Sequence, residues 1–346
     1  MLKRSPHFIS SLRRPKKIGI KVAISTLALS TAFALSACSS SKDTSPEVEQ
    51  SVGLAVDAPR VMVLDPGSGD RQLLKYKDIT AAEEAAAQEV MINISEGFAQ
   101  TVVDAAAVDP QAPAGGDVTT IHLPVTASTK AAEFSDQETV SASRDISVTV
   151  GDPTISDTSQ AADANSAEGF ALGIRATDSG QHTTLSFAAP VDSTEPGRML
   201  MEQNLLTFTS LPIVFPTEEV GVGAQWSVDS RVTGEATLLQ TVTYTITEIT
   251  GDNVNVDVEV SQRPSIGALE ITGDNAEESS EQLTVLNSNT TSVGSLSIDL
   301  NQPLPTSGQV SWTTRVIYGG ANEQVRVVQD ATSSVSFGDE QSQISH

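Results

Sequence analysis

Cysteine, aromatic residues and histidine are all scarce in this chain. A single cysteine occurs in 346 residues, which excludes a disulfide within the chain and a metal site built from several thiolates. Aromatic residues make up 4% of the sequence, which argues against a carbohydrate-binding surface of stacked tryptophan and tyrosine rings. No two of the four histidines have the spacing of a metal-ligand pair. We therefore expect a fold that rests on its apolar core and holds no cofactor or metal.

Basic residues are also few. Lys and Arg number 20 against 44 Asp and Glu, a formal net charge of −24. Seven of the basic residues lie in the first 21 positions, so the rest of the chain is more acidic still. A polyanion of this kind should not bind nucleic acid or anionic lipid headgroups by general electrostatics.

Sequence motifs that carry catalytic chemistry are missing as well. The chain has no Gly-x-Ser-x-Gly nucleophile elbow, no phosphate-binding glycine loop and no His-Glu-x-x-His pair. His122 falls in a predicted strand, His182 follows a turn and His346 is the last residue. We predict a non-enzymatic protein without catalytic residues. The less favoured alternative is a hydrolase whose site is assembled from distant positions.

The one cysteine, Cys38, has an informative context. A basic leader precedes the apolar run of residues 22–34, and Leu35-Ser36-Ala37-Cys38 closes that run. This order is typical of a bacterial lipoprotein signal, in which the thiol is lipidated and the chain is cut just before it. The run is too short for a transmembrane helix, which needs about 20 residues. The sequence therefore predicts a protein anchored through Cys38 to a cell membrane, on its extracytoplasmic face.

Alternation of apolar and polar residues dominates the remainder. Val254, Val256, Val258 and Val260 alternate with polar residues, and several other segments do the same. Such strands have one wet face and form antiparallel sheets. We predict a mainly β (α+β) fold, a large curved antiparallel sheet or half-barrel of about ten to thirteen strands with one or two covering helices. Two β domains divided near residues 190–215 are the alternative.

The best helix candidate spans residues 194–211. Ser193 or Thr194 can cap its start, and Pro212 stops it. Its apolar residues admit two interpretations, which are packing against the core and lining of a cavity that holds an apolar ligand. The candidate ligand-binding residues on it are Met199, Met201, Leu205 and Phe208.

Two patches resemble segments of uncharacterised cell-envelope lipoproteins of actinobacteria. These are Pro216–Trp226 and the leucine-rich Asp65–Tyr76. That family has no assigned activity, so the resemblance implies a compartment and no functional residues. In architecture alone, the expected fold is similar to that of LolA and the mycobacterial LppX and LprG group, which hold lipid in a half-barrel with helical cover. Gly221 and Gly223 independently predict a close backbone approach, with Trp226 buried after it.

These patterns divide the chain into a signal segment (1–37), a lipidated flexible tether (38–56), a β-rich domain (57–338) and a polar tail (339–346). The leading functional expectation is an envelope lipoprotein that binds a hydrophobic or amphiphilic ligand between the sheet and the 194–211 helix. The alternative is a structural module that contacts other envelope proteins through its sheet surface.

Overall fold

The computed structural model of the protein describes residues 46–79, 87–135, 138–232, 238–266, 268–271 and 281–338. Its main strands are β1 (Val52–Ala55), β2 (Arg60–Asp65), β4 (Gln88–Asp104), β5 (Thr119–Ala131), β6 (Arg144–Val150), β8 (Ala171–Ala176), β9 (His182–Ala188), β11 (Gln225–Val232), β12 (Leu238–Thr250), β13 (Asn253–Pro264), β15 (Glu281–Asp299), β16 (Ser307–Gly319) and β17 (Val325–Phe337). Shorter elements are β3 (Ser68–Gln72), β7 (Thr154–Ile155), β10 (Val220–Val222), β14 (Ala268–Ile271), and the helices α1 (Ala161–Ser166) and α2 (Glu195–Thr209).

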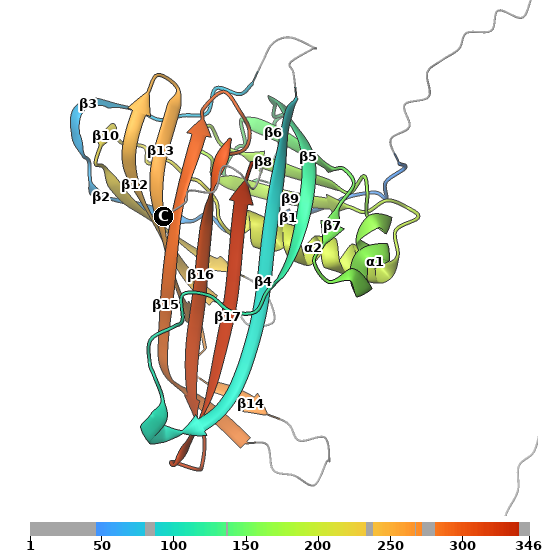
Figure 1. The fold of residues 1–346 in the computed structure, drawn as a ribbon. Coiled ribbons are helices and arrows are strands. Elements are labelled where there is room, and N and C mark those ends of the chain that lie inside the picture. Colours follow the sequence, from blue (N-terminus) through green and yellow to red (C-terminus); the bar gives the residue numbers. More distant parts are fainter. Residues whose placement is uncertain are drawn as a thin grey trace, which may run out of the picture. The chain divides into compact units, whose positions relative to one another are not determined.

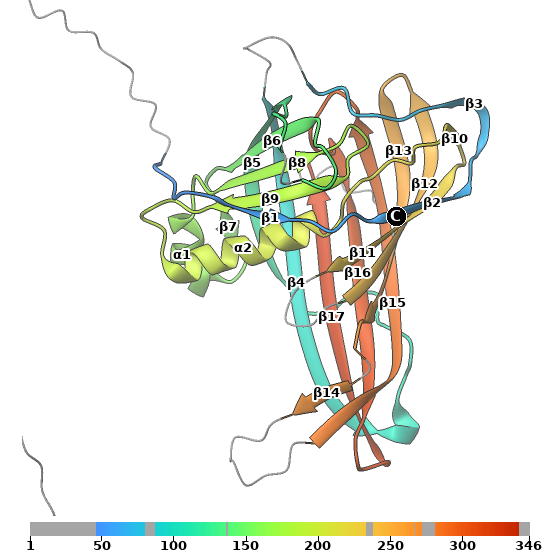
Figure 2. The same cartoon turned by 180° about the vertical axis from the view of Figure 1, so that it is seen from behind.

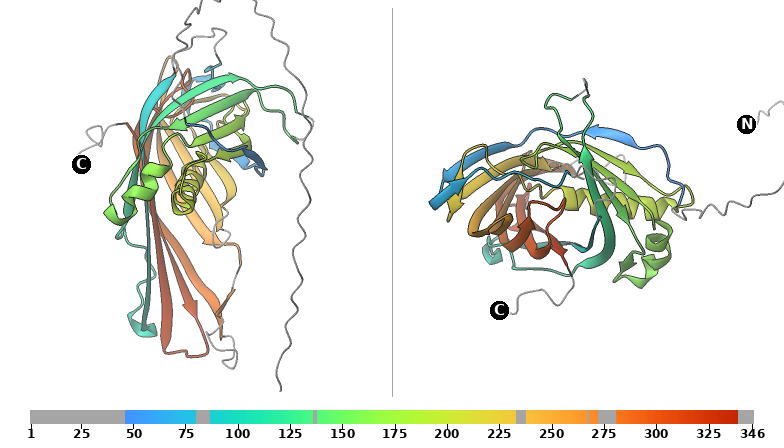
Figure 3. Two further views of the ribbon diagram at one scale, coloured as in Figure 1. Left: turned by 90° about the vertical axis from the view of Figure 1, so that its right-hand side faces the viewer. Right: turned by 90° about the horizontal axis from the view of Figure 1, so that it is seen from above.

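One antiparallel sheet holds most of these strands. Its order is β1-β9-β8-β6-β5-β4-β17-β16-β15-β13-β12-β11-β2, with β7 paired to β5 and β14 to β15. The predicted fold class, a large curved antiparallel sheet with two helices, is confirmed (Figure 1). Strands that precede α2 in the sequence and strands that follow it belong to this single sheet, because the whole of β17 pairs with β4. Figure 3 shows the sheet curving around α2.

The sheet stays open, and one segment links its two edges. β1 lies at one edge and β2 at the other, although only residues 56–59 separate them in the chain. Figure 2 shows this segment crossing from β1 to β2. The predicted flexible tether is therefore too long at its C-terminal end. Residues 46–56 lie against the domain, with Glu49 donating its amide to the Ala189 carbonyl at 2.9 Å and β1 paired to β9.

The predicted 194–211 helix forms as α2, between Glu195 and Thr209. The Thr194 hydroxyl accepts the Gly197 amide at 3.1 Å, and a proline occupies the first turn. Glu96 of β4 holds the far end of the helix, because its carboxylate accepts from Gln203 at 2.7 Å and from the Thr207 hydroxyl. These contacts fix α2 on the inner face of the sheet.

The core centres on a fully buried tryptophan, as the glycine-tryptophan patch predicted. Trp226 stacks on Tyr244 with ring centroids 5.3 Å apart and donates its indole N–H to the Val214 carbonyl at 2.8 Å. A Cβ on Gly221 would lie 2.4 Å from the Ser68 carbonyl oxygen, so this turn packs backbone against backbone. The hydrogen bond from Trp226 to Val214 holds the segment that follows α2 against the sheet.

The sheet has two regions that differ in cover. In the covered region, α2 and the segment after it pack on the inner face. In the projecting region, residues 97–104, 281–289, 314–319 and 325–331 of β4, β15, β16 and β17 continue past the helices (Figure 1). The segment of residues 105–118, here called the strap, crosses the outer face of this region. The Ala112 amide donates to the Asn289 side chain at 3.1 Å.

The alanine- and glutamate-rich stretch 80–88, whose composition favours a helix, lies mainly outside the described residues, on 80–86. The sequence Ile-Thr-Gly-Asp-Asn occurs twice, at residues 249–253 and 271–275. The first forms the tip of the hairpin between β12 and β13, and the second continues beyond Ile271 outside the described residues. The signal segment, Leu35, Ser36, Ala37, Cys38 and the tail also lie outside this part of the chain, so lipidation stays a prediction.

Candidate functional site

The space between α2 and the sheet, predicted as a ligand site, brings together three of its four candidate residues. Met201 and Leu205 are fully buried, and Phe208 packs edge-on against Phe337 of β17 with ring centroids 6.1 Å apart. Met199 points away and its side chain is 61% exposed. Residues two positions apart on an α-helix point in directions that differ by about 200° around its axis, so Met199 and Met201 cannot share one face.

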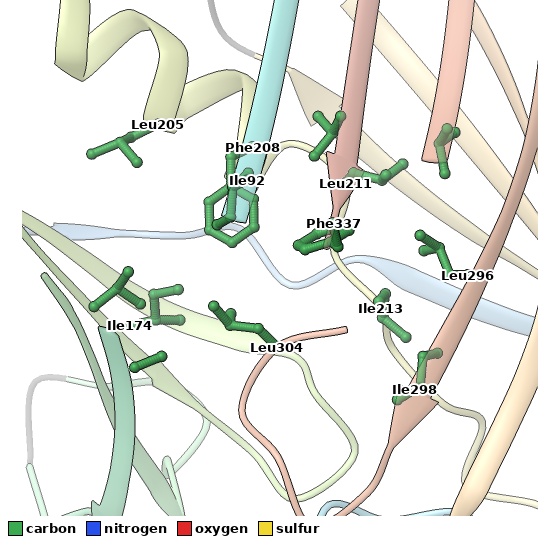
Figure 4. Packing of buried hydrophobic residues seen from close by; sticks show 14 of the residues in the cluster. Ile92, Ile174, Leu205, Phe208, Leu211, Ile213, Leu296, Ile298, Leu304 and Phe337 are labelled. Atoms are coloured by element: carbon green, nitrogen blue, oxygen red, sulfur yellow. The ribbon is translucent and has the colours of Figure 1, made fainter. Parts of the chain in front are cut away.

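This interior is filled by side chains. A cavity of about 50 Å³ lies at the C-terminal end of α2, between the helix, the Pro303–Pro305 loop and strands β6 and β8. Figure 4 shows Phe208, Leu211, Leu304 and Phe337 converging on the same interior. A water needs about 10–15 Å³ of such volume. The cavity therefore has the volume of a few water molecules and leaves no room for a lipid chain in this form.

A buried ion pair forms the polar wall of the cavity. The Arg144 guanidinium of β6 donates to both Asp78 carboxylate oxygens, at 2.8 and 2.6 Å, and the Thr129 hydroxyl donates to the same carboxylate at 2.6 Å. The Tyr76 ring covers the guanidinium, with 4.0 Å between the Arg144 Cζ atom and the ring centroid. Removal of one partner of a buried ion pair strongly destabilises the fold, because the other charge is left buried and unpaired. This cluster therefore stabilises the covered region.

The remaining titratable groups of the cavity are neutral at pH 7. Burial, with the Arg144 charge nearby, lowers the pKa of His182 to about 4. Burial raises the pKa of Tyr76 to about 12. An imidazole with so low a pKa is a weak base, because burial and the Arg144 charge both oppose its protonation.

The other described histidine, His122, lies on the outer face of the sheet. Its Nδ1 atom is 2.7 Å from the Asn93 side-chain oxygen, and the Asn93 amide donates to the Ser336 hydroxyl at 3.0 Å. The Asn93 side chain thus separates the His122 imidazole from the Ser336 hydroxyl. His122 therefore does not activate Ser336 as a nucleophile in this arrangement. Among the residues that the structure describes, no group of three His, Cys, Asp or Glu side chains is arranged to hold a metal ion.

A large hollow lies on the outer face of the sheet. A groove of about 820 Å³, here called the seam groove, is lined by β12, β13, β15 and β16. Asn255, Asp257 and Glu259 of β13 point into this face, because the alternate valines of the strand point into the core. Serines supply much of the opposite wall, including Ser295 and Ser297. The groove has a mixed polar and apolar lining with two acidic residues, Asp257 and Glu259, and no basic side chain lines it among the residues that the structure describes.

The groove exists because β13 and β15 part from one another. Direct backbone pairing of the two strands ends at Asp257 and Ser295. Beyond that point, the Ser292 hydroxyl accepts the Val260 amide and the Thr290 hydroxyl accepts the Gln262 amide, both at 2.9 Å. Side-chain hydroxyls thus take the place of carbonyl groups, which widens the seam while satisfying the backbone donors.

Sequence reasoning did not find this groove, although a signal for it is present. The alternation of β15 fails over Ser288-Asn-Thr-Thr-Ser292, where polar residues face both sides of the strand. A strand with polar residues on both faces is weakly specified by burial. Here it marks the place where hydroxyls bridge two strands.

A second exposed feature is an apolar row on the inner face of the projecting region. The register places Val102, Val327, Tyr318 and Val285 side by side across four strands. Tyr318 is buried, whereas Val102 and its strand neighbour Phe98 are each 65% exposed. No helix covers this row within the described ranges.

Comparison with known proteins leaves this site without a precedent. No protein family, no curated protein and no solved structure matches the chain. Among the described residues, none of the helices has the length and apolar character needed to cross a bilayer. The functional argument therefore rests on the residues of this chain alone.

Proposed function

We propose that this protein is a lipid-anchored, non-enzymatic interaction module of the cell envelope, exported and held to the membrane through Cys38. One contrast carries the proposal. The interior between α2 and the sheet offers about 50 Å³, whereas the outward-facing seam groove offers about 820 Å³. Pockets that hold small molecules or cofactors have volumes of about 300–1,000 Å³. The surface of the sheet, rather than its interior, has the space to receive a partner.

The alternative is the binding of a hydrophobic or amphiphilic ligand between α2 and the sheet. It is favoured by the mixed character of the cavity wall, where Arg144 and Tyr76 face Phe208 and Leu211. Such a wall could hold the head and the first carbons of an amphiphile. This function requires α2 or the Pro303–Pro305 loop to move, because the present cavity has the volume of only a few water molecules.

Native mass spectrometry of the Cys38→Ser protein separates the two. We expect the mass of the bare chain, with no lipid in its organic extract. A reproducible added mass that matches a lipid would overturn the interaction proposal in favour of the ligand alternative, and Met201→Ala and Phe208→Ala should then reduce that added mass.

A photo-crosslinking residue tests the interaction directly. Placed at Val293, exposed at the rim of the seam groove, it should yield one dominant adduct in the native host. The matched control at Thr149, exposed on β6 outside the groove, should yield none. Equal labelling from both positions would contradict a specific contact at the groove.

A further inference from the structure

We propose that the seam groove receives an extended segment of a partner protein that carries lysine or arginine at every second residue. This inference rests on the proposed interaction function and names the chemistry of the partner at the same site. Three properties of the groove support it, namely its direction, its charge and the small size of its walls.

The groove runs along strands. Its long walls are residues 255–259 of β13 and 292–297 of β15, which lie in antiparallel register where they are paired. These strands are directly paired up to Asp257 and Ser295 and part beyond them, so the hollow follows the strand direction. An extended chain fits a hollow of this direction better than a compact ligand does.

The walls are made of small residues. Gly294, Ser295 and Gly308 line the hollow, and the hydroxyls of the serines offer both donors and acceptors. Gly294 also cannot carry a larger side chain, because a Cβ there would meet Val310 at 2.9 Å. The neighbouring Val293, 65% exposed, adds one apolar contact at the rim.

The charge of the groove selects a cation. Asp257 and Glu259 are both exposed on the outer face of β13, two residues apart. Two residues along a strand span about 7 Å, so an extended partner presents every second side chain at the same interval. The net charge of −24 repels anionic partners in addition. No hydrogen bond or ion pair within the described part of the chain occupies either carboxylate.

The strap fixes the position of one end. Thr291 of β15 donates its hydroxyl to the Ala112 carbonyl at 2.7 Å, directly before the groove begins at Ser292. Thr247 and Ser307 line the groove at its opposite end. A partner segment would therefore lie between these residues and the strap.

The test uses the Cys38→Ser protein and a fluorescent peptide in which Lys and Ser alternate, followed by anisotropy at about 150 mM salt, where charges more than about 8 Å apart are screened. Asp257→Asn with Glu259→Gln should weaken binding about five- to tenfold, since two exposed ion pairs contribute up to about 1 kcal/mol each. The matched control, Glu218→Gln with Glu219→Gln, removes the same charge from an exposed turn and should change binding less than twofold.

Equal weakening by the two double variants would overturn the inference, because the affinity for the peptide would then depend on net charge alone. Ser295→Arg is an independent check, since it places a cation and a bulky side chain inside the groove. It should abolish the groove-dependent part of the binding without requiring either carboxylate to change. If the peptide binds independently of the groove while the crosslinker at Val293 still captures one partner, the basic-segment inference fails and the interaction function stands.

Discussion

The covered and projecting regions of the sheet are built from the same strands and yet have different interiors. Under α2, alternate residues such as Ile92 and Ile94 of β4 are fully buried. Further along the same strand and on the same face, Phe98 and Val102 are largely exposed. Alternation therefore sets which face of a strand is apolar, but burial requires a second layer on that face. The function we propose depends on this division, since the covered region supplies stability and leaves other surfaces free.

A buried polar chain marks the boundary between the regions. The Gln240 amide donates to the Ser210 carbonyl at the end of α2 at 2.6 Å, Gln262 donates to Gln240 at 2.8 Å, and Thr314 donates to Gln262 at 2.9 Å. Because every member has a partner, the chain can be buried without a large desolvation penalty. The main core ends here, and a smaller cluster around Leu283, Val316 and Tyr318 begins beyond it.

The largest expected effect lies in the covered region. Asp78→Ala leaves the buried Arg144 guanidinium without its carboxylate and should lower the free energy of unfolding by about 3–5 kcal/mol. Urea denaturation measures it. The control is Lys75→Met, which breaks the half-exposed pair with Asp178 and should cost less than about 1 kcal/mol. Similar losses in the two variants would erase the distinction between buried and exposed pairs.

A matched pair of truncations compares the two regions directly. Leu205→Ala, under the sheet, should cost about 2–5 kcal/mol, because it leaves a cavity in a filled interior. Val102→Ala, on the uncovered face, should change stability by less than about 0.5 kcal/mol. Denaturant midpoints at unchanged slope measure both. A loss above about 1 kcal/mol at Val102 would show that a second layer covers this face in solution.

Acidity should weaken the covered region through His182. Its folded-state pKa of about 4 lies below the usual value of 6.5, so the unfolded chain takes up a proton first as pH falls. The stability that the neutral imidazole contributes is full above about pH 6.5 and is lost progressively toward pH 4. Thermal unfolding between pH 7 and pH 4 should show this slope, and His182→Gln should reduce it. An unchanged slope in His182→Gln would assign the acid sensitivity to other groups.

A smaller loss than that of the buried pair is expected from the ion pair of the projecting region. Arg315 donates to both Asp330 oxygens at 2.8 and 2.7 Å and to the Asp109 carbonyl of the strap at 3.0 Å. Arg315→Met should cost about 1–2 kcal/mol, since the pair is partly exposed. Native-state hydrogen exchange should then accelerate in residues 314–319 and 325–331 and stay unchanged in the covered region. Acceleration in β6 or β8 would mean that the two regions open as one unit.

Much of the fold was predictable because it depends on local pattern. The valines of β13, the cap at Thr194 and the stop at Pro212 located a strand and a helix correctly. The glycines before Trp226 indicated a tight turn and a buried ring. The strand β1 was missed because Val52–Ala55 is short and lies next to a polar tether, and only its pairing with β9 makes it a strand.

The candidate site was less predictable, for a physical reason. The apolar residues of the predicted helix included Met201, Leu205 and Phe208, which are buried, and Met199, which is exposed. Their pattern could not tell a filled interior from a ligand cavity. That distinction depends on how closely side chains from distant strands fit together. The seam groove likewise arises from the separation of two strands. The hydroxyls of Ser292 and Thr290 bridge this separation, and their role becomes clear only from the positions of Val260 and Gln262 on the facing strand.

The sequence by itself determined that this chain forms an antiparallel sheet with one main helix, because hydrophobic period and caps act over a few residues. It also supplied the lipoprotein signal at Cys38 as a prediction. Only the tertiary structure decided that the space between α2 and the sheet is filled by side chains, that one sheet has a covered and a projecting region, and that a groove opens between β13 and β15. These properties depend on contacts between residues far apart in the chain, and local patterns carry no information on how such contacts fit.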